Sequence, residues 1–72
     1  MKTLKELKKD CFREWREYQG GGIKLNYQPR SKRWNEPDRF FYNIGGGTRK
    51  GVYSVPEFKK TYLYELLKAD AL

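Results

Sequence analysis

Apolar residues recur at helical spacing in the first segment of the chain. They are three or four positions apart, on one stripe of a helix with about 3.6 residues per turn: Leu4, Leu7, Cys11, Trp15 and Tyr18. Phe12 widens the stripe. Thr3 and Glu6 form a capping-box pattern that predicts the start of this helix, and glycines 20–22 predict its end.

The middle of the chain has the pattern of strands. Apolar and polar residues alternate strictly over residues 23–28, so Ile23, Leu25 and Tyr27 share one face, and Pro29 ends the strand. Residues 39–44 are rich in aromatic side chains that favour strands, and residues 51–53 form a partner strand across a turn at 45–50. Together these segments predict three antiparallel strands joined as a meander.

The last segment predicts a second helix. Ser54 is a suitable cap, Pro56 fits the first turn, and Glu57 completes a second capping box. Tyr53 and Phe58 stand where a hydrophobic staple would form. The apolar face of this helix comprises Phe58, Tyr62, Leu63, Leu66 and Leu67.

These elements predict an α+β fold, a single domain over residues 1–72 in which two helices pack on one face of a three-stranded antiparallel meander (αβββα). A chain of 72 residues buries only about 60% of its unfolded surface, so shallow surfaces and loops are expected to carry the function. Cys11 and five aromatic residues are expected in the core: Phe12, Trp15, Phe40, Tyr42 and Phe58. Phe41 and Tyr64 are expected to be exposed, because they lie off these apolar faces.

This order of elements is similar in layout to the double-stranded RNA-binding domain and to some small mRNA-cleaving toxins of bacterial toxin–antitoxin pairs. Those toxins use a histidine, which this chain does not contain. Lys59 and Lys60 correspond only faintly to the basic cluster of such RNA-binding domains. The likeness is one of layout and assigns the chain to no family.

Composition argues against several kinds of chemistry. With no histidine and one cysteine, Cys11, the chain can form neither an intramolecular disulfide nor a conventional Cys/His zinc site, and it lacks the base of Ser-His and Cys-His nucleophile systems. Charged residues interrupt the N-terminal segment where a signal peptide needs an apolar run, and no stretch is long enough to span a membrane. We therefore expect a cytoplasmic binding protein rather than an enzyme, with no cofactor, no metal, no small-molecule substrate and no membrane contact.

Positive charge is concentrated in the middle of the chain. The net charge is +7, and residues 20–54 hold seven basic against two acidic residues. This distribution is typical of a surface that meets a polyanion such as nucleic acid. Charge of this kind also serves solubility alone, and that alternative stays open.

Two loops carry cations suited to phosphate. Residues 30–34 place Arg30, Lys32 and Arg33 beside Trp34, a combination that pairs with phosphates and stacks on unpaired bases. The alternative is that Trp34 folds back over the core. Residues 45–51 form a glycine-rich loop with Arg49 and Lys50, whose backbone N–H groups could approach a phosphate; the alternative is a merely flexible turn.

One further pattern resembles the Pro-Asp and Glu-x-Lys motif of restriction-type nucleases: Pro37 with Asp38, then Glu57 with Lys59. In that family the carboxylates hold Mg²⁺ and the lysine supports the attacking water. The motif lies there on a core strand, whereas here it falls in the first turn of a helix. We therefore interpret the match as accidental.

The sequence thus predicts a small, basic, non-catalytic nucleic-acid-binding module that contacts the phosphate backbone through loops of its sheet, with DNA or RNA left open. The predicted contact residues are Lys24, Arg30, Lys32, Arg33, Trp34, Arg39, Arg49 and Lys50. The alternative is a protein-interaction module, such as a phage or mobile-element accessory or inhibitor that docks on an acidic protein surface.

Overall fold

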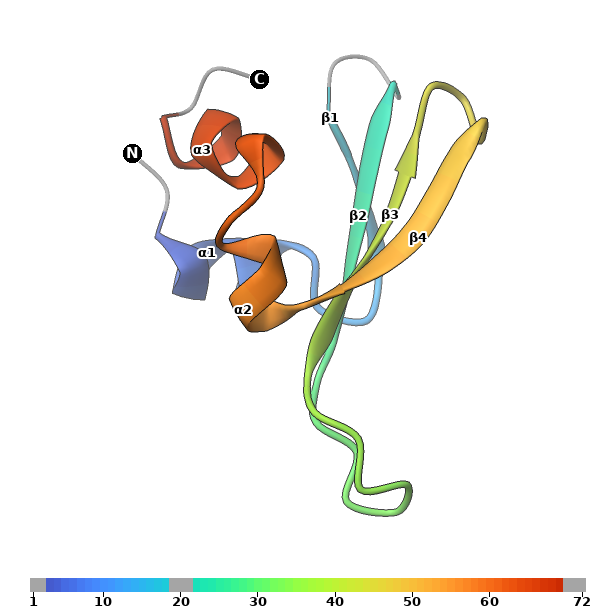
Figure 1. Ribbon diagram of the computed structural model, residues 1–72, viewed down its shortest axis with the longest axis vertical. Helices are drawn as coiled ribbons and strands as arrows, with labels where there is room; N and C mark the ends of the chain where they lie inside the picture. The colour runs from blue at the N-terminus through green and yellow to red at the C-terminus, as the bar shows by residue number, and fades with distance from the viewer. Residues whose placement is uncertain (1–2, 19–21, 70–72) are drawn as a thin grey trace.

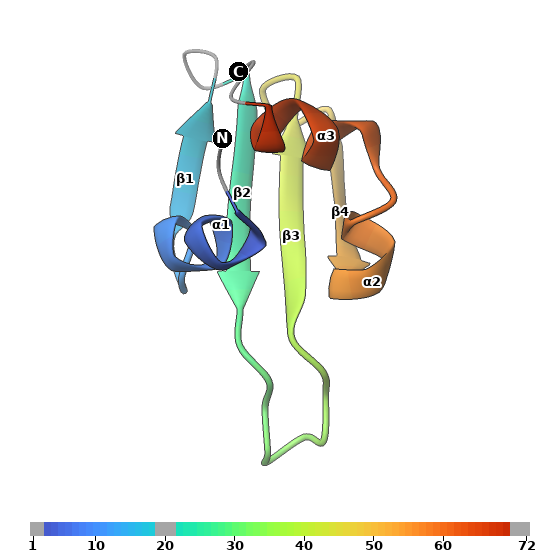
Figure 2. The ribbon, with the colours of Figure 1, turned by 90° about the vertical axis from the view of Figure 1, so that its left-hand side faces the viewer.

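A four-stranded antiparallel sheet with helices on one side forms the molecule. The computed structural model describes residues 3–18 and 22–69. The elements in chain order are α1 (Leu4–Asp10), β1 (Trp15–Tyr18), β2 (Ile23–Gln28), β3 (Arg39–Ile44), β4 (Arg49–Ser54), α2 (Val55–Phe58) and α3 (Tyr62–Lys68). The strands pair in the order β1-β2-β3-β4, a meander, and α1, α2 and α3 all lie on the same face of the sheet (Figures 1 and 2). The α+β class is confirmed, but the prediction of three strands and two helices is wrong in detail.

The first helix is much shorter than its apolar stripe predicts. Thr3 caps it as expected, accepting a hydrogen bond from the Glu6 N–H at 3.2 Å. After Cys11 the chain joins the edge of β2: the Arg13 N–H donates to the Tyr27 carbonyl at 2.8 Å, and the Tyr27 N–H donates to the Cys11 carbonyl at 2.8 Å. Arg13 turns the backbone with a φ of 57°.

This early end of α1 changes the environment of three residues of the predicted apolar stripe. Trp15 and Tyr18 lie on β1, where Tyr18 is buried but Trp15 is half exposed, and Phe12 is also half exposed. The expectation that Phe12 and Trp15 belong to the core is therefore wrong. The predicted helix end at glycines 20–22 falls largely outside the described residues.

The predicted C-terminal helix is divided into two. Ser54 caps α2 through the Glu57 N–H, at 3.4 Å, as predicted. The helix ends after Phe58, and Thr61 caps α3 by accepting from the Tyr64 N–H at 3.1 Å. Because of this break, the expected environments of Tyr62 and Tyr64 are reversed. Tyr62 is 77% exposed, and Tyr64 packs with its ring centroid 5.4 Å from that of Phe58. Both expectations for these side chains are wrong.

The core lies between the helices and one face of the sheet. Its buried members come from α1, its C-cap, three strands, α2 and α3: Leu7, Cys11, Tyr18, Leu25, Tyr27, Phe40, Phe58 and Leu67. The rings of Phe40 and Phe58 stack with centroids 4.2 Å apart, which ties α2 to β3. None of the helices within residues 3–18 and 22–69 is long and apolar enough to cross a membrane.

The strand register divides the side chains between two faces, because paired residues of neighbouring strands point to the same side. The face under the helices carries Leu25, Tyr27, Phe40, Tyr42 and Tyr53. The opposite face, called the open face below, consists of three cross-strand rows. These are Trp15–Asn26–Phe41–Val52, Glu17–Lys24–Asn43–Lys50 and Gln28–Arg39–Ser54.

The ring of Tyr42 lies against Gly51 and leaves no room for a side chain at that position. Gly51 pairs with Tyr42, and a Cβ atom added to Gly51 would lie 2.5 Å from Cζ of that ring. The Tyr42 ring also stacks on Tyr53 with centroids 4.7 Å apart, so it cannot move away without losing that contact.

We therefore expect Gly51→Ala to lower the free energy of unfolding by about 1 to 3 kcal/mol, because the added methyl group overpacks the site. Urea unfolding followed by circular dichroism measures the change. In a Tyr42→Ala background the same substitution should cost far less. An equal cost in both backgrounds would contradict the assigned contact.

Candidate functional site

The open face combines apolar side chains with cations. In its central row Trp15 is 50% exposed, Val52 is 49% exposed and Phe41 is partly buried between them. Asn26, the fourth member, is buried and accepts a hydrogen bond on Oδ1 from Gln28 Nε2 at 2.6 Å. None of the helices within residues 3–18 and 22–69 covers this face (Figures 1 and 2).

A shallow hollow lies on the open face across β1, β3 and β4. Its volume is about 400 Å³, and its lining includes Trp15, Phe41, Asn43, Lys50 and Val52. Aromatic and aliphatic walls with one ammonium group suit a flat, partly apolar ligand that carries negative charge.

Two cations of the open face are already paired with acids. Lys24 Nζ lies 3.6 Å from Glu17 Oε1, within the same cross-strand row. Arg39 Nη1 lies 2.9 Å from Glu36 Oε2, and its guanidinium carbon lies 5.3 Å from the centroid of the Phe41 ring. Such partly exposed pairs are weak and can exchange for a phosphate contact.

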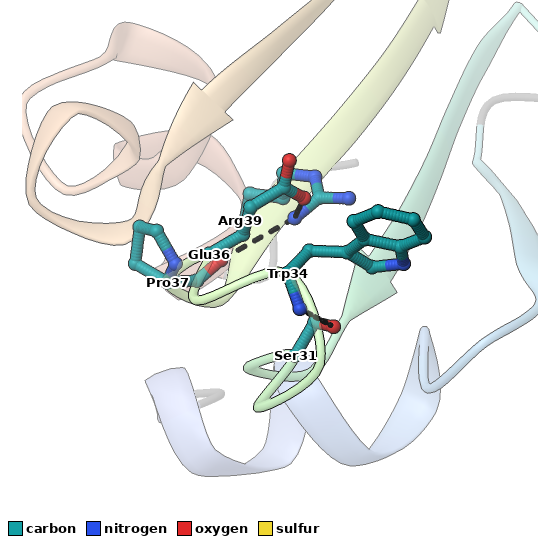
Figure 3. A network of polar contacts seen from close by, with 5 residues as sticks. All are labelled: Ser31, Trp34, Glu36, Pro37 and Arg39. Atoms are coloured by element: carbon teal, nitrogen blue, oxygen red, sulfur yellow. Dashed lines mark hydrogen bonds and ion pairs between the residues drawn. The ribbon is translucent and has the colours of Figure 1, made fainter.

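The connection between β2 and β3, residues 29–38, is an arm that contains internal hydrogen bonds. Backbone hydrogen bonds join Ser31 and Glu36 in both directions, at 3.0 and 3.1 Å. The Trp34 N–H donates to Ser31 Oγ at 3.3 Å (Figure 3). The arm extends beyond the sheet, and its tip bends away from the side on which the helices lie (Figure 1).

The tip of the arm presents Trp34 and two cations to solvent. Trp34 is 67% exposed, and the Arg33 guanidinium lies 5.2 Å from its ring centroid. The alternative in which Trp34 folds over the core is therefore wrong. Among the described residues, no acidic side chain forms an ion pair with Arg30, Lys32 or Arg33.

A buried tyrosine fixes the base of the arm. Tyr27 Oη donates to Asp38 Oδ2 at 2.6 Å, and Lys8 Nζ of α1 lies 3.4 Å from the same oxygen. These two partners lower the pKa of the Asp38 carboxyl, the Tyr27 hydrogen bond being the larger cause. Burial, reinforced by the hydrogen bond to Asp38, raises the pKa of Tyr27 to about 12.

The structure places the eight predicted contact residues in separate regions. Arg30, Lys32, Arg33 and Trp34 lie on the arm, at one end of the sheet, and the turn between β3 and β4 lies at the other end (Figure 1). Lys24, Arg39 and Lys50 lie between these ends on the open face.

Arg49 lies neither on the arm nor on the open face. It is paired with Ile44, on the helix side of the sheet. The predicted loop 45–51 is also shorter than expected, because β4 begins at Arg49 and Thr48 Oγ1 donates to the Gly45 carbonyl at 3.0 Å. The two predicted loops therefore do not form one site.

The nuclease-like residues have structural partners. Asp38 Oδ2 is occupied by Tyr27 and Lys8, and Glu57 Oε1 accepts from the Ser54 hydroxyl at 3.0 Å. Within the described part of the chain, no group of three or more Cys, Asp or Glu side chains could hold a metal ion.

Three open-face residues were missed as site candidates: Trp15, Phe41 and Val52. The position of Phe41 was predictable, because it alternates with Phe40 and Tyr42 and was expected on the face of the strand opposite to theirs. The position of Trp15 was not predictable, because its spacing from Cys11 also fits a helix.

No protein-family model, curated protein or solved structure matches this chain. The function must therefore be argued from the open face and the arm themselves.

The anchoring of the arm predicts a pH-dependent contribution to stability. A carboxyl whose folded pKa lies below its ordinary 3.8 stabilises the fold above that value, and the contribution is lost as the pH falls through the folded pKa. Asp38→Asn should lower the free energy of unfolding by about 1 to 3 kcal/mol at neutral pH. Urea unfolding at several pH values should show that the difference from the native chain narrows below about pH 4.

Glu36→Gln is the matched control, since it removes an exposed carboxylate of the same arm and should cost less than about 1 kcal/mol. A difference between the native chain and Asp38→Asn that stays constant down to about pH 2 would contradict the assigned role of Asp38.

Proposed function

We propose that this protein is a non-catalytic nucleic-acid-binding module whose contact surface is the open face of the sheet together with the arm of residues 29–38. The observation that carries the proposal is the confinement of every described helix to one side of the sheet. The other side is thereby left with exposed aromatic residues and cations.

Charge and shape on this side support a polyanionic partner. Lys50 borders the hollow, Lys24 lies in the same row, and Lys32 and Arg33 extend the positive surface along the arm. The only acidic residue in the three open-face rows is Glu17, which is paired with Lys24. Lysine and arginine side chains around an exposed aromatic surface supply phosphate contacts and base contacts together.

A protein partner with an acidic surface is the second candidate. The exposure of Trp15 and Trp34 favours it, because tryptophan and arginine are enriched at the energetic centres of protein interfaces. The same open face and arm would be used, so the two candidates differ in the chemistry of the partner and not in the position of the surface.

Charge reversal on the arm tests the proposal. The triple variant Arg30→Glu, Lys32→Glu and Arg33→Glu should weaken binding to random-sequence nucleic acid at least tenfold in fluorescence anisotropy. It should also reduce the slope of log Kobs against log salt by about 2 to 3, because about three phosphate contacts are lost.

The matched control reverses three exposed lysines of the helix side, Lys5, Lys59 and Lys60, and has the same net charge as the arm variant. If both triple variants weaken binding equally, attraction is due to net charge and the open face is not the contact surface. If the native chain binds neither DNA nor RNA but is retained by an acidic protein after nuclease treatment, the second candidate replaces the first.

A further inference from the structure

The hollow on the open face is lined by aromatic and aliphatic side chains. Trp15 and Val52 stand at opposite ends of the central row, with Asn26 and Phe41 between them. Stacking on such a surface requires the flat face of a base. In a duplex those faces are covered by neighbouring pairs, and only base edges and the backbone are presented outward.

Resting on the function proposed above, we infer that the ligand is single-stranded and that an unpaired base stacks against Trp15 in the open-face hollow, with Lys50 beside its phosphate. Phe41 lines the hollow, and the Arg39 guanidinium lies over its ring, 5.3 Å from the centroid. Lys50 is exposed and lines the same hollow, so its ammonium group is free to follow the backbone.

Charge favours a nucleic-acid strand over a second copy of the chain as the ligand of the open face. Each chain carries a net charge of +7, and pairing two open faces would bring Lys50 of both copies together, along with Lys24 and Arg39, which each have one acidic partner. Like charges at such an interface are repulsive, whereas a nucleic-acid strand supplies the opposite charge at every nucleotide.

Size is consistent with one strand crossing the sheet. The central row crosses all four strands, and neighbouring strands are about 4.8 Å apart, so the distance from Trp15 to Val52 is about 14 Å. A single strand can place adjacent bases along such a row, and the arm, which extends from the ends of β2 and β3 (Figure 1), offers cations to a backbone that turns toward that end of the sheet.

The chain contains two tryptophans, so Trp34→Phe leaves Trp15 as the only indole fluorophore. We expect oligothymidine to quench the fluorescence of this variant on binding, because a stacked base contacts the ring directly. A self-complementary duplex of the same length should bind more weakly and leave the fluorescence unchanged. Anisotropy of labelled oligonucleotides supplies the dissociation constants.

In the otherwise native chain, Trp15→Ala should weaken binding of oligothymidine roughly tenfold or more, the effect of losing one base–aromatic stack. The salt slope should stay unchanged, because no phosphate contact is removed. Tyr62→Ala is the matched control: Tyr62 is the more exposed ring, but it lies on α3, on the helix side of the sheet. It should leave the affinity unchanged.

A second pair of variants guards against a folding defect in Trp15→Ala. Val52→Glu places an acid at the hollow and should weaken binding of oligothymidine at least tenfold, whereas Val52→Thr keeps the branched shape and should stay within about threefold.

Tight duplex binding with unchanged Trp15 fluorescence would overturn the single-strand inference and leave the proposed function standing. Oligothymidine binding that neither Trp15→Ala nor Val52→Glu weakens would overturn the single-strand inference and would also remove the open face from the proposed contact surface. Failure of the native chain to bind any oligonucleotide would overturn both.

Discussion

The stacking of Phe58 on Phe40 determines which side of this protein is available to a partner. Phe58 is fully buried in α2, immediately after β4, and its contact with Phe40, the second residue of β3, holds the C-terminal helices over one face of the sheet. Tyr53 and Tyr64 surround the same ring at 6.3 and 5.4 Å. Because a small chain has too few apolar residues to cover both faces, the opposite face is left without a helical layer.

The hydrogen-bonded connection between Cys11 and Tyr27 of β2 determines where the first helix ends and the first strand begins. Backbone hydrogen bonds between these two segments end α1 and lead the chain into β1. β1 adds a fourth strand to the sheet. The sheet thereby gains Trp15 at one end of the row that contains Phe41 and Val52. The bond from Tyr27 to Asp38 links the same strand to the arm, so one residue of β2 helps to position both parts of the proposed surface.

Local patterns were sufficient to predict much of this fold. Thr3 and Ser54 cap helices as their capping boxes predicted, and the alternation in residues 23–28 and 39–44 assigned the core faces of two central strands correctly. The division of residues 11–18 between a helix end and a strand could not be obtained in this way. It depends on pairing with β2, a non-local contact that overrides a short 3.6-residue pattern. The break before α3 had a local signal in Thr61, a good N-cap, but the continuous apolar pattern concealed it.

The candidate site was predictable only in part, for the same reason. The cations of the arm could be located from the sequence, but the exposure of Trp34 could not be decided from it. The separation of the arm from the β3–β4 turn follows from strand direction. The grouping of Trp15, Phe41 and Val52 follows from register across all four strands. A surface assembled from single residues of different strands leaves no contiguous motif in the sequence.

The central claim is that the open face and the arm, rather than the helical side, meet a nucleic acid. The most direct measurement is amide chemical-shift mapping by NMR during titration with single-stranded DNA and RNA. We predict that the largest shifts occur in residues 30–36 and around Trp15, Phe41 and Val52, and that α1 and α3 shift little. The largest shifts in α1 and α3, with an unchanged open face, would contradict the account.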